Sequence, residues 1–476
     1  MNGRKEAQKK ETNQSMNTLP ILADYMAFLR AKMPRAEVCG FEPQTQCAPS
    51  LFPHQQDVAE WAIKGGRRAV FANFGLGKTR MHLQIAKWIF EHTGGRYLFV
   101  APLGVRHVFI EEDGPELGMC IQYVRNDEEI LAAKSPYLIT NYERVRDGGI
   151  SLKHFAGAGL DEASVLRSYG SKTYQEFLPL FKEVPYRFVF TATPSPNSYK
   201  ELIHYAAFLG VMDSGEALTR FFQRNSEQAG ELSLYPHMEQ QFWYWLSTWA
   251  CFITKPSDLG YSDDGYDLPP LHVHWHRVEV DHRKAWKQHD SWGQMQLLQD
   301  QSTGLKEAAE VKRDTISLRV AKALEIMGSE SDETHWLLWH DLEKERAAIQ
   351  ESIPEATCVW GTQDIDDRED RIRDFGKGKF RILATKPVIA GSGCNFQRHC
   401  SHALFLGTGY KFNDFIQAVH RLWRFLQKEE VHVHIIYSEA EATIMQELKS
   451  KWRAHNELMS RMSELLRNNK LTNLEA

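Results

Sequence analysis

Short apolar runs alternate with amphipathic stretches from Leu51 to about residue 200. Short runs rich in β-branched and aromatic residues predict strands, and apolar positions that recur every three to four residues predict helices. Strands that alternate with helices in this way indicate βαβ units and a mainly parallel sheet, whose ligands gather at the carboxyl ends of the strands. The predicted strands are Ala69 to Ala72, Tyr97 to Ala101, Tyr137 to Thr140 and Arg187 to Thr191, and the predicted helices include Lys78 to His92 and Lys172 to Lys182.

The same alternation resumes after Leu268-Pro269-Pro270 and predicts a second α/β domain. Its predicted strands are Leu271 to Val278, Trp336 to Trp339, Arg381 to Thr385, Ala403 to Gly407 and Val431 to Tyr437. The helical patterns between them cover residues 304–327, 341–351, 363–375 and 412–424.

Residues 203–266 interrupt this rhythm with helical, aromatic-rich sequence that includes Trp243, Trp245 and Trp249. A protrusion that contacts DNA or a partner is one interpretation, but burial is favoured because aromatic rings usually supply packing area. We expect a polar tail over residues 1–15, a helix from Thr18 to Met33 and a long amphipathic helix from Glu439 to Leu466. The predicted divisions are an N-terminal extension (1–50), a first α/β domain (51–202), a helical insertion (203–266), a second α/β domain (267–438) and a C-terminal helix (439–476).

Composition narrows the class of protein. The chain has 476 residues, of which 42% are hydrophobic and 25% charged, as in a soluble globular protein. No run approaches the roughly 18 apolar residues of a membrane span, and no signal-peptide pattern is present, so we expect a cytoplasmic or nucleoplasmic protein. Seven scattered cysteines do not indicate a disulfide framework. A net charge of −5 excludes a globally basic coat for nucleic acid but permits a local basic groove.

The segment Phe71 to Arg80, FANFGLGKTR, is typical of a phosphate-binding loop. Gly75 and Gly77 let successive N–H groups face phosphate oxygens, Lys78 would reach the β- and γ-phosphates, and Thr79 would hold Mg²⁺. Ala72 stands where the full pattern has a further glycine. The alternative is an ordinary strand-to-helix turn.

Two further groups of polar residues follow apolar runs. Asp161 and Glu162 end such a run, where Asp161 would hold Mg²⁺ and Glu162 would orient an attacking water. An acidic pair in a loop is usually solvated surface, but its place after the lysine loop favours the catalytic interpretation. Thr191 and Thr193 follow another predicted strand and would sense the γ-phosphate, although alone they indicate no more than a turn.

Arg421 and Arg424 lie three residues apart in a helical pattern of the second domain and so share one predicted helix face. Two guanidinium groups in this arrangement would stabilise negative charge on a γ-phosphate held by the other domain. The alternative is an exposed basic helix face.

The order of these motifs from Leu51 to Gln427 resembles that of the Swi/Snf-type superfamily 2 DNA-dependent ATPases. Gly75-Leu76-Gly77-Lys78-Thr79 matches the family's phosphate loop, Asp161-Glu162-Ala163 is similar to its motif II, and Gln417 to Arg424 with Gln427 is similar to its motif VI. The other segments that resemble family motifs are Leu51 to Gln55, Ala101 to Leu103, Thr140 to Glu143, Thr191 to Pro194 with Asn197, Ile253 to Lys255 with Leu268 to Pro270, and Thr385 with Gly391 to Asn395.

This resemblance implies two RecA-like P-loop NTPase lobes with ATP and Mg²⁺ between them. It assigns Gln55 to the adenine, Thr191, Thr193, Gly391 and Gly393 to the nucleotide site, and Lys78, Asp161, Glu162, Arg421 and Arg424 to catalysis. Thr140, Asn141 and Thr385 are the implied DNA-backbone contacts, with Lys377 and Lys379 as further candidates. Alternating closure of the lobes would then move the protein along DNA without reading its sequence.

Ser164 departs from the family pattern, which usually has histidine there, so the resemblance does not establish how hydrolysis couples to motif III. The chain shows no bromodomain-like, chromodomain-like or zinc-binding appendage, so a compact bacterial or phage translocase fits better than a nucleosome remodeller. A separately encoded nuclease or a replication or recombination protein is an implied partner.

The alternative function is an ATP-gated subunit, which would bind nucleic acid or protein and switch conformation without translocation. A nuclease lacks support, because no further cluster of carboxylates with Lys or His appears outside the ATP motifs. A zinc site is conceivable at His272, His274, His276, His432 and His434, but strand-face histidines without a cysteine or carboxylate at ligand spacing are more often half-exposed. We interpret Cys394, His399, Cys400 and His402 as structural.

Overall fold

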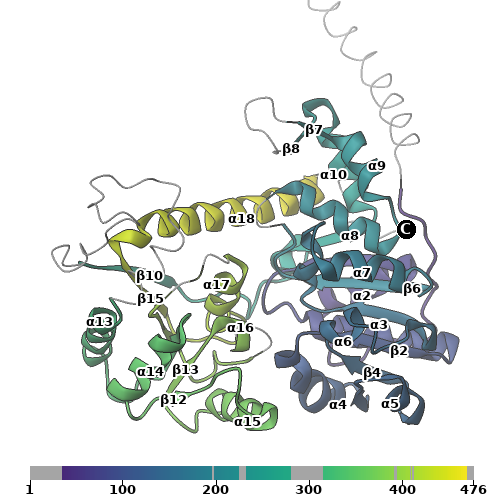
Figure 1. Ribbon diagram of the computed structural model, residues 1–476. Coiled ribbons are helices and arrows are strands. Elements are labelled where there is room, and N and C mark those ends of the chain that lie inside the picture. The colour runs from purple at the N-terminus through teal and green to yellow at the C-terminus, as the bar shows by residue number, and fades with distance from the viewer. Residues whose placement is uncertain are drawn as a thin grey trace, which may run out of the picture.

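The computed structural model describes residues 35–195, 198–224, 232–279, 315–390, 394–407, 409 and 412–468. They form two α/β units that lie side by side, each built on a parallel sheet (Figure 1). We call the unit with the seven-stranded sheet the first unit and the unit with the six-stranded sheet the second unit. The predicted helix from Thr18 to Met33 lies outside the described residues.

The first sheet has the strand order β3-β4-β2-β5-β6-β1-β9, and every neighbouring pair is parallel. Helices on both faces give it two hydrophobic cores, and its strands are therefore apolar on both sides. The strands are β1 (Arg67–Ala72), β2 (Arg96–Val100), β3 (Ile121–Tyr123), β4 (Tyr137–Thr140), β5 (Phe155–Leu160), β6 (Tyr186–Thr191) and β9 (Ala250–Ile253).

Helices connect these strands and pack against the sheet. The longer ones are α2 (Pro53–Gly65), α3 (Lys78–Thr93), α7 (Lys172–Phe181), α8 (Leu202–Leu209), α9 (Ser214–Phe221) and α10 (Glu239–Ser247). The shorter ones are the π-helical turn η2 (Val108–Asp113), α4 (Gly114–Glu116), α5 (Asp127–Ala132), α6 (Tyr142–Arg146) and the 3₁₀ turn η4 (Ala163–Arg167).

Residues 203–266, predicted as a helical insertion, contain strands as well as helices. Ala250 to Ile253 form β9, which pairs with β1 at the edge of the first sheet, and β7 (Phe222–Arg224) pairs antiparallel with β8 (Leu232–Leu234). Only Thr248 and Trp249 separate the four-residue apolar run of β9 from the aromatic helix α10, so the sequence gives no clear boundary between them. Trp243, Trp245 and Trp249 are buried in the core of the first unit, as predicted.

The second sheet has the order β10-β15-β14-β11-β13-β12 and is also parallel throughout. Its strands are β10 (Leu271–Val278), β11 (Trp336–Trp339), β12 (Thr357–Cys358), β13 (Ile382–Thr385), β14 (His402–Phe405) and β15 (Val431–Ser438). Its helices are α13 (Ile316–Gly328), α14 (Glu343–Ser352), α15 (Ile365–Gly376), α16 (Pro387–Ala390) and α17 (Phe412–Val419). The first half of the helix predicted over residues 304–327 lies outside the described residues.

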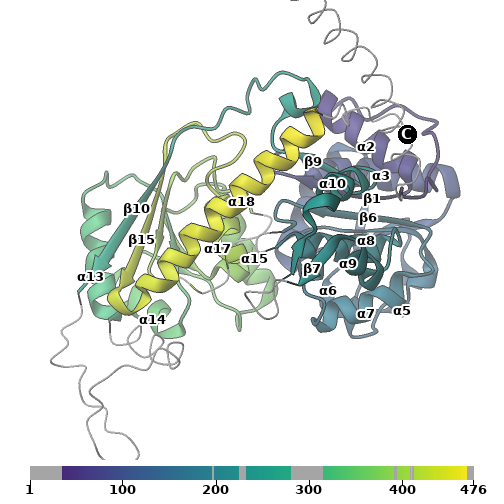
Figure 2. The ribbon, with the colours of Figure 1, turned by 90° about the horizontal axis from the view of Figure 1, so that it is seen from above.

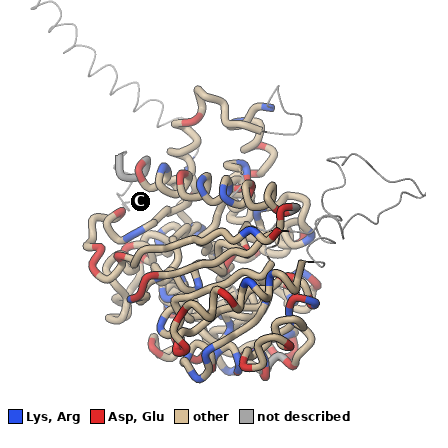
Figure 3. Tube along the Cα trace, turned by 90° about the vertical axis from the view of Figure 1, so that its left-hand side faces the viewer, with Lys and Arg blue, Asp and Glu red and all other residues tan. Residues whose placement is uncertain are grey.

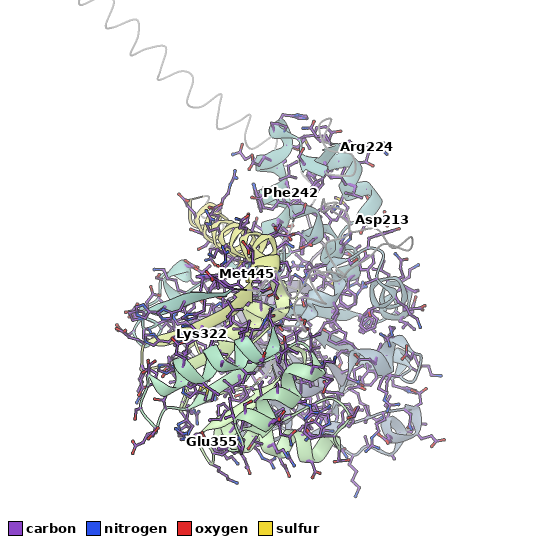
Figure 4. All side chains as sticks on the ribbon, turned by 60° about the vertical axis from the view of Figure 1, so that its left-hand side comes forward. Asp213, Arg224, Phe242, Lys322, Glu355 and Met445 are labelled. Carbon is purple, nitrogen blue, oxygen red and sulfur yellow. The ribbon has the colours of Figure 1, made fainter. Side chains whose placement is uncertain are left out.

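The last helix, α18 (Ala442–Asn468), spans both units, as Figure 2 shows from above. Near its start, Met445 and Leu448 belong to the core of the second unit, and Figure 4 labels Met445 there. Near its end, Leu458 and Met462 belong to the core of the first unit. The predicted C-terminal helix is thus a physical connection between the two units.

Charged residues of both signs are mixed along the face shown in Figure 3, α18 included. None of the helices within the described ranges is both long and apolar enough to cross a membrane.

Candidate active site

The loop between β1 and α3 has the backbone that its glycines predict. Gly75 and Gly77 have positive φ angles of 84° and 79°. A Cβ on Gly77 would lie 2.2 Å from Nε2 of Gln55, and a Cβ on Gly75 would lie 2.8 Å from Cβ of Phe425. Both positions therefore require glycine, on conformational and on steric grounds. Thr79 lies half-buried in the first turn of α3, where N–H groups and the helix dipole favour an anion.

Lys78 lies half-buried at the start of α3 and folds back over this loop. Its Nζ donates hydrogen bonds to the carbonyl oxygens of Ala72 at 2.9 Å and Asn73 at 3.2 Å. Desolvation lowers the pKa of Lys78 to about 8, against the opposing effect of Glu162 and Asp161. A phosphate group would replace the lost solvation of this ammonium group, so the loop fits the polyanion that its sequence predicts.

Asp161 and Glu162 follow β5 and are both buried, so the solvated-surface alternative does not hold. Burial, followed by repulsion from Glu162, raises the pKa of Asp161 to about 7. Tyr142 fixes the backbone by donating a hydrogen bond from its hydroxyl to the Asp161 carbonyl at 2.6 Å. A cation near this carboxylate would offset the cost of its burial.

Glu162 has a φ angle of 49°, in the left-handed region. Within the described residues only Leu426 shares this property among residues other than glycine, with a φ of 72°. Such a conformation costs about 1–2 kcal/mol and persists only where surrounding structure enforces it. One of these residues is a candidate catalytic group and the other lies two positions after Arg424, so backbone strain is concentrated at the candidate site.

The strand order explains why these groups meet. β5, β6 and β1 are neighbours in the first sheet, and the carboxyl ends of parallel strands lie at one edge. The acidic pair follows β5, the threonine pair lies at the end of β6 and just after it, and the glycine loop after β1 leads to Lys78 at the start of α3. Thr191 and Thr193 are buried, and Oγ1 of Thr191 accepts a hydrogen bond from the N–H of Thr193 at 3.1 Å.

Side chains of α17, in the second unit, reach this edge of the first sheet. Gln417 donates from Nε2 to Oε2 of Glu162 at 3.4 Å. Thr193 donates from Oγ1 to Oδ1 of Asn413 at 2.6 Å, and Asn413 donates from Nδ2 to Oγ of Ser164 at 3.5 Å. Ser164 therefore contacts the other unit. No sequence pattern singled out Asn413.

The helix predicted through Arg424 ends instead at Val419, and both arginines lie in the turns that follow. The N–H of Arg424 donates to the Leu422 carbonyl at 3.1 Å, whereas a continuing helix would pair it with the His420 carbonyl. The Gln427 side chain donates to the same Leu422 carbonyl. The two guanidinium groups still converge, because Nη1 of Arg421 and Nη1 of Arg424 both donate to the Cys394 carbonyl, at 3.2 and 3.3 Å. Arg421 is buried and Arg424 half-buried, so neither belongs to an exposed basic face.

Electrostatics link these residues into one group. Asp161 and Glu162 raise the pKa of Lys78, whereas Arg424 and Arg421 lower it. Burial is the main cause that lowers the pKa of Arg424 to about 9, and the positive charge of Arg421 is the second. Nε of Arg424 is buried and has no hydrogen-bond partner. Three cationic side chains thus face two carboxylates, an arrangement suited to a polyanion accompanied by a divalent cation.

Aromatic rings border the glycine loop. Tyr266 stacks on Phe425 with ring centroids 4.6 Å apart, and Phe52 meets Phe425 edge-on at 6.2 Å. Gln55 is buried beside them, donating from Nε2 to the Leu76 carbonyl and accepting at Oε1 from the Phe52 N–H. Sequence reasoning found Gln55 but missed Tyr266 and Phe425, because an aromatic residue in a linker or turn carries no distinctive signal.

The predicted DNA contacts are only partly accessible. Thr140 and Thr385 are buried, and the Thr140 hydroxyl donates to the Val124 carbonyl, so neither side chain offers an exposed donor to a phosphate. Asn141 is buried as well and donates from Nδ2 to Glu143. Lys377 and Lys379 are exposed. Gly391, Gly393 and Asn197 lie outside the described residues.

A comparison with models of known protein families gives no match, and a comparison with curated proteins gives none.

Proposed function

We propose that this protein is an ATP hydrolase with two RecA-like lobes, of the Swi/Snf-type superfamily 2 class, and that it uses ATP to move along DNA. One observation carries the proposal: Arg421 and Arg424 of the second unit lie in the same charged group as Lys78, Asp161 and Glu162 of the first. The first unit contributes three of these five charged side chains and the second unit two, and phosphoryl transfer from a nucleoside triphosphate would use both sets.

The first unit would bind the nucleotide. The loop at Gly75 and Gly77 would surround the phosphates, and Lys78 would turn from the Ala72 and Asn73 carbonyls toward the β- and γ-phosphates. Thr79 and Asp161 would hold Mg²⁺, which neutralises charge on the phosphate oxygens. The rings of Phe52, Tyr266 and Phe425 offer a stacking surface for a base next to Gln55.

Hydrolysis needs a water molecule oriented for attack and positive groups that stabilise the negative charge developing on the phosphate oxygens. Glu162 is the candidate for orienting the water, and its contact with Gln417 makes its position depend on the second unit. Arg421 and Arg424 would stabilise the charge that develops on the γ-phosphate oxygens. Because the two halves come from different units, phosphate release would weaken the contact between them.

Two further ion pairs join the units and would break and re-form as the units move during ATP hydrolysis. Arg106 pairs with Glu369 at 2.7 Å, and Arg373 pairs with Glu111 at 3.1 Å. DNA phosphates would compete with these carboxylates for the arginines, and the exposed Lys377 lies near them in sequence. Binding through phosphates would be sensitive to salt and tolerant of sequence.

The test is ATP hydrolysis by the full chain with and without duplex DNA. We expect DNA to stimulate hydrolysis and Lys78→Ala to remove nearly all of it. The control is Lys87→Ala, which changes a half-buried lysine on the same helix. Nucleotide-dependent DNA binding without hydrolysis would instead identify an ATP-gated binding subunit, and DNA-stimulated turnover in Lys78→Ala would show that the loop is misassigned.

A further inference from the structure

Six histidines gather on one face of three neighbouring strands of the second sheet. The parallel register places His272 of β10 and His402 of β14 on either side of His432 of β15, and His274 beside His434. Their rings stack, with centroids 4.9 Å apart for His272 and His432 and 5.0 Å apart for His402 and His432. The sixth is His276, close to α13, where Figure 4 labels Lys322.

One corner of this face also holds a carboxylate. Glu430 immediately precedes β15, and its Oε2 lies 3.0 Å from Nε2 of His272. The potential ligand atoms of His272, Glu430 and His432 all lie within 4.8 Å of one another. The sequence pattern missed Glu430, because only the pairing of β10 with β15 brings its side chain to His272.

A second histidine orients one of these three groups. Nε2 of His274 and Nδ1 of His432 form a hydrogen bond of 3.2 Å. This contact occupies Nδ1, so Nε2 of His432 is the nitrogen that remains for a metal. Metal-ligating histidines usually have their other ring nitrogen held by a hydrogen bond in this way.

We propose that His272, Glu430 and His432 bind Zn²⁺, with water completing the coordination. Two imidazole nitrogens and one carboxylate oxygen suit Zn²⁺, whereas Mg²⁺ and Ca²⁺ prefer oxygen ligands alone. Zinc bonds of about 2.0–2.1 Å need ligand atoms about 3.3 Å apart, which rotation of these partly exposed side chains provides. A bound zinc ion would link the edge strand β10, through His272, to β15, through His432. The zinc site shares no residue with the candidate active site.

Calorimetric titration of the chelator-treated full chain with zinc chloride tests this site. We expect about one Zn²⁺ per chain, a higher melting temperature with Zn²⁺ than with Mg²⁺, and the visible absorption of tetrahedral cobalt when Co²⁺ replaces Zn²⁺. His432→Gln and Glu430→Gln should each weaken binding more than tenfold. His274→Gln should weaken it about 10–100-fold, as loss of the partner of a ligating histidine does.

The control is His237→Gln, an exposed histidine of the first unit, which should leave zinc affinity unchanged. Glu430 is exposed, so Glu430→Gln is expected to keep the fold even if His432→Gln does not, and circular dichroism checks this. Absence of zinc binding by the wild-type chain would overturn the proposal, as would unchanged affinity in folded Glu430→Gln. Neither result bears on ATP hydrolysis.

Discussion

The hydroxyl of Thr193 donates a 2.6 Å hydrogen bond to the amide oxygen of Asn413 and so joins the loop after β6 to α17 of the other unit. The amide nitrogen of Asn413 also reaches Ser164, in the turn after the acidic pair. Two loops of the first unit thus contact one residue of the second. Through Asn413, Ser164 and the turn after the acidic pair are linked to Thr193.

Removal of this shared contact should slow catalysis more than it weakens nucleotide binding. Asn413→Ala should lower kcat for ATP hydrolysis by about tenfold, the effect of losing roughly 1.4 kcal/mol of transition-state stabilisation. The Kd for ATP should change little, since Asn413 is not among the proposed phosphate ligands. A double-mutant cycle with Thr193→Val checks the contact, because coupled residues give non-additive effects. If the effects of the two substitutions on kcat are strictly additive, Asn413 and Thr193 are not coupled.

The two arginines should be needed for the chemical step. We expect Arg421→Ala or Arg424→Ala to reduce single-turnover hydrolysis about 10³-fold or more, because each would stabilise charge on the γ-phosphate. Lysine should restore little activity, since it lacks the planar guanidinium group. Arg398→Ala, an exposed arginine of the same unit, is the matched control. A loss below tenfold would exclude that arginine from the transition state.

The raised pKa of Asp161 predicts a pH dependence of stability. Its pKa is 3.8 ordinarily and about 7 in the fold, so between these values the folded protein retains a proton that the unfolded chain releases. The free energy of unfolding should therefore fall as pH rises through this window. Nucleotide-free Asp161→Asn should melt above wild type at about pH 8 and close to it at about pH 4.

The control for that measurement is Asp367→Asn, which changes an exposed carboxylate on α15. Its melting temperature should follow that of wild type at each pH. Equal melting temperatures of Asp161→Asn and wild type at about pH 8 would show that burial of this carboxylate costs nothing.

Helix α18 should contribute to the stability of the first unit, although it begins in the second. Met462 is fully buried in the core of the first unit, so Met462→Ala should cost about 2–5 kcal/mol of unfolding free energy. Urea denaturation measures this, and Glu457→Ala on the exposed face of the same helix is the control. A change below 1 kcal/mol in Met462→Ala would show that α18 is only loosely packed there.

Most strands were predictable because a fully buried parallel strand is a short apolar run. Trp336 to Trp339 and Tyr137 to Thr140 are fully buried and have the predicted bounds. The half-buried edge strand Leu271 to Val278 also has its predicted bounds, because its apolar residues alternate with histidines. β12 was missed because its pairing involves only Thr357 and Cys358. The edge strand β9 was missed because it follows an aromatic helix without a turn signal.

The site was predictable where chemistry follows a local pattern, as in the glycine loop and the acidic pair. The site was not predictable where contacts between distant segments determine the position of a residue. The periodicity around Arg421 continues as a helix, yet the N–H of Arg424 donates to the Leu422 carbonyl, two residues back, instead of to the His420 carbonyl. Asn413 and Tyr266 likewise acquire their roles only when distant segments meet. The burial of Thr140 and Thr385 was also not predictable, since a motif match does not reveal whether a hydroxyl is exposed.

The anchoring of α18 in two hydrophobic cores limits how the molecule can open. A helix of 27 residues is stiff, so the units cannot simply swing apart on the linker at Pro269 and Pro270. The two units could separate only by rotating about the axis of α18, or by moving the side chains at one end of α18 out of the hydrophobic core in which they pack.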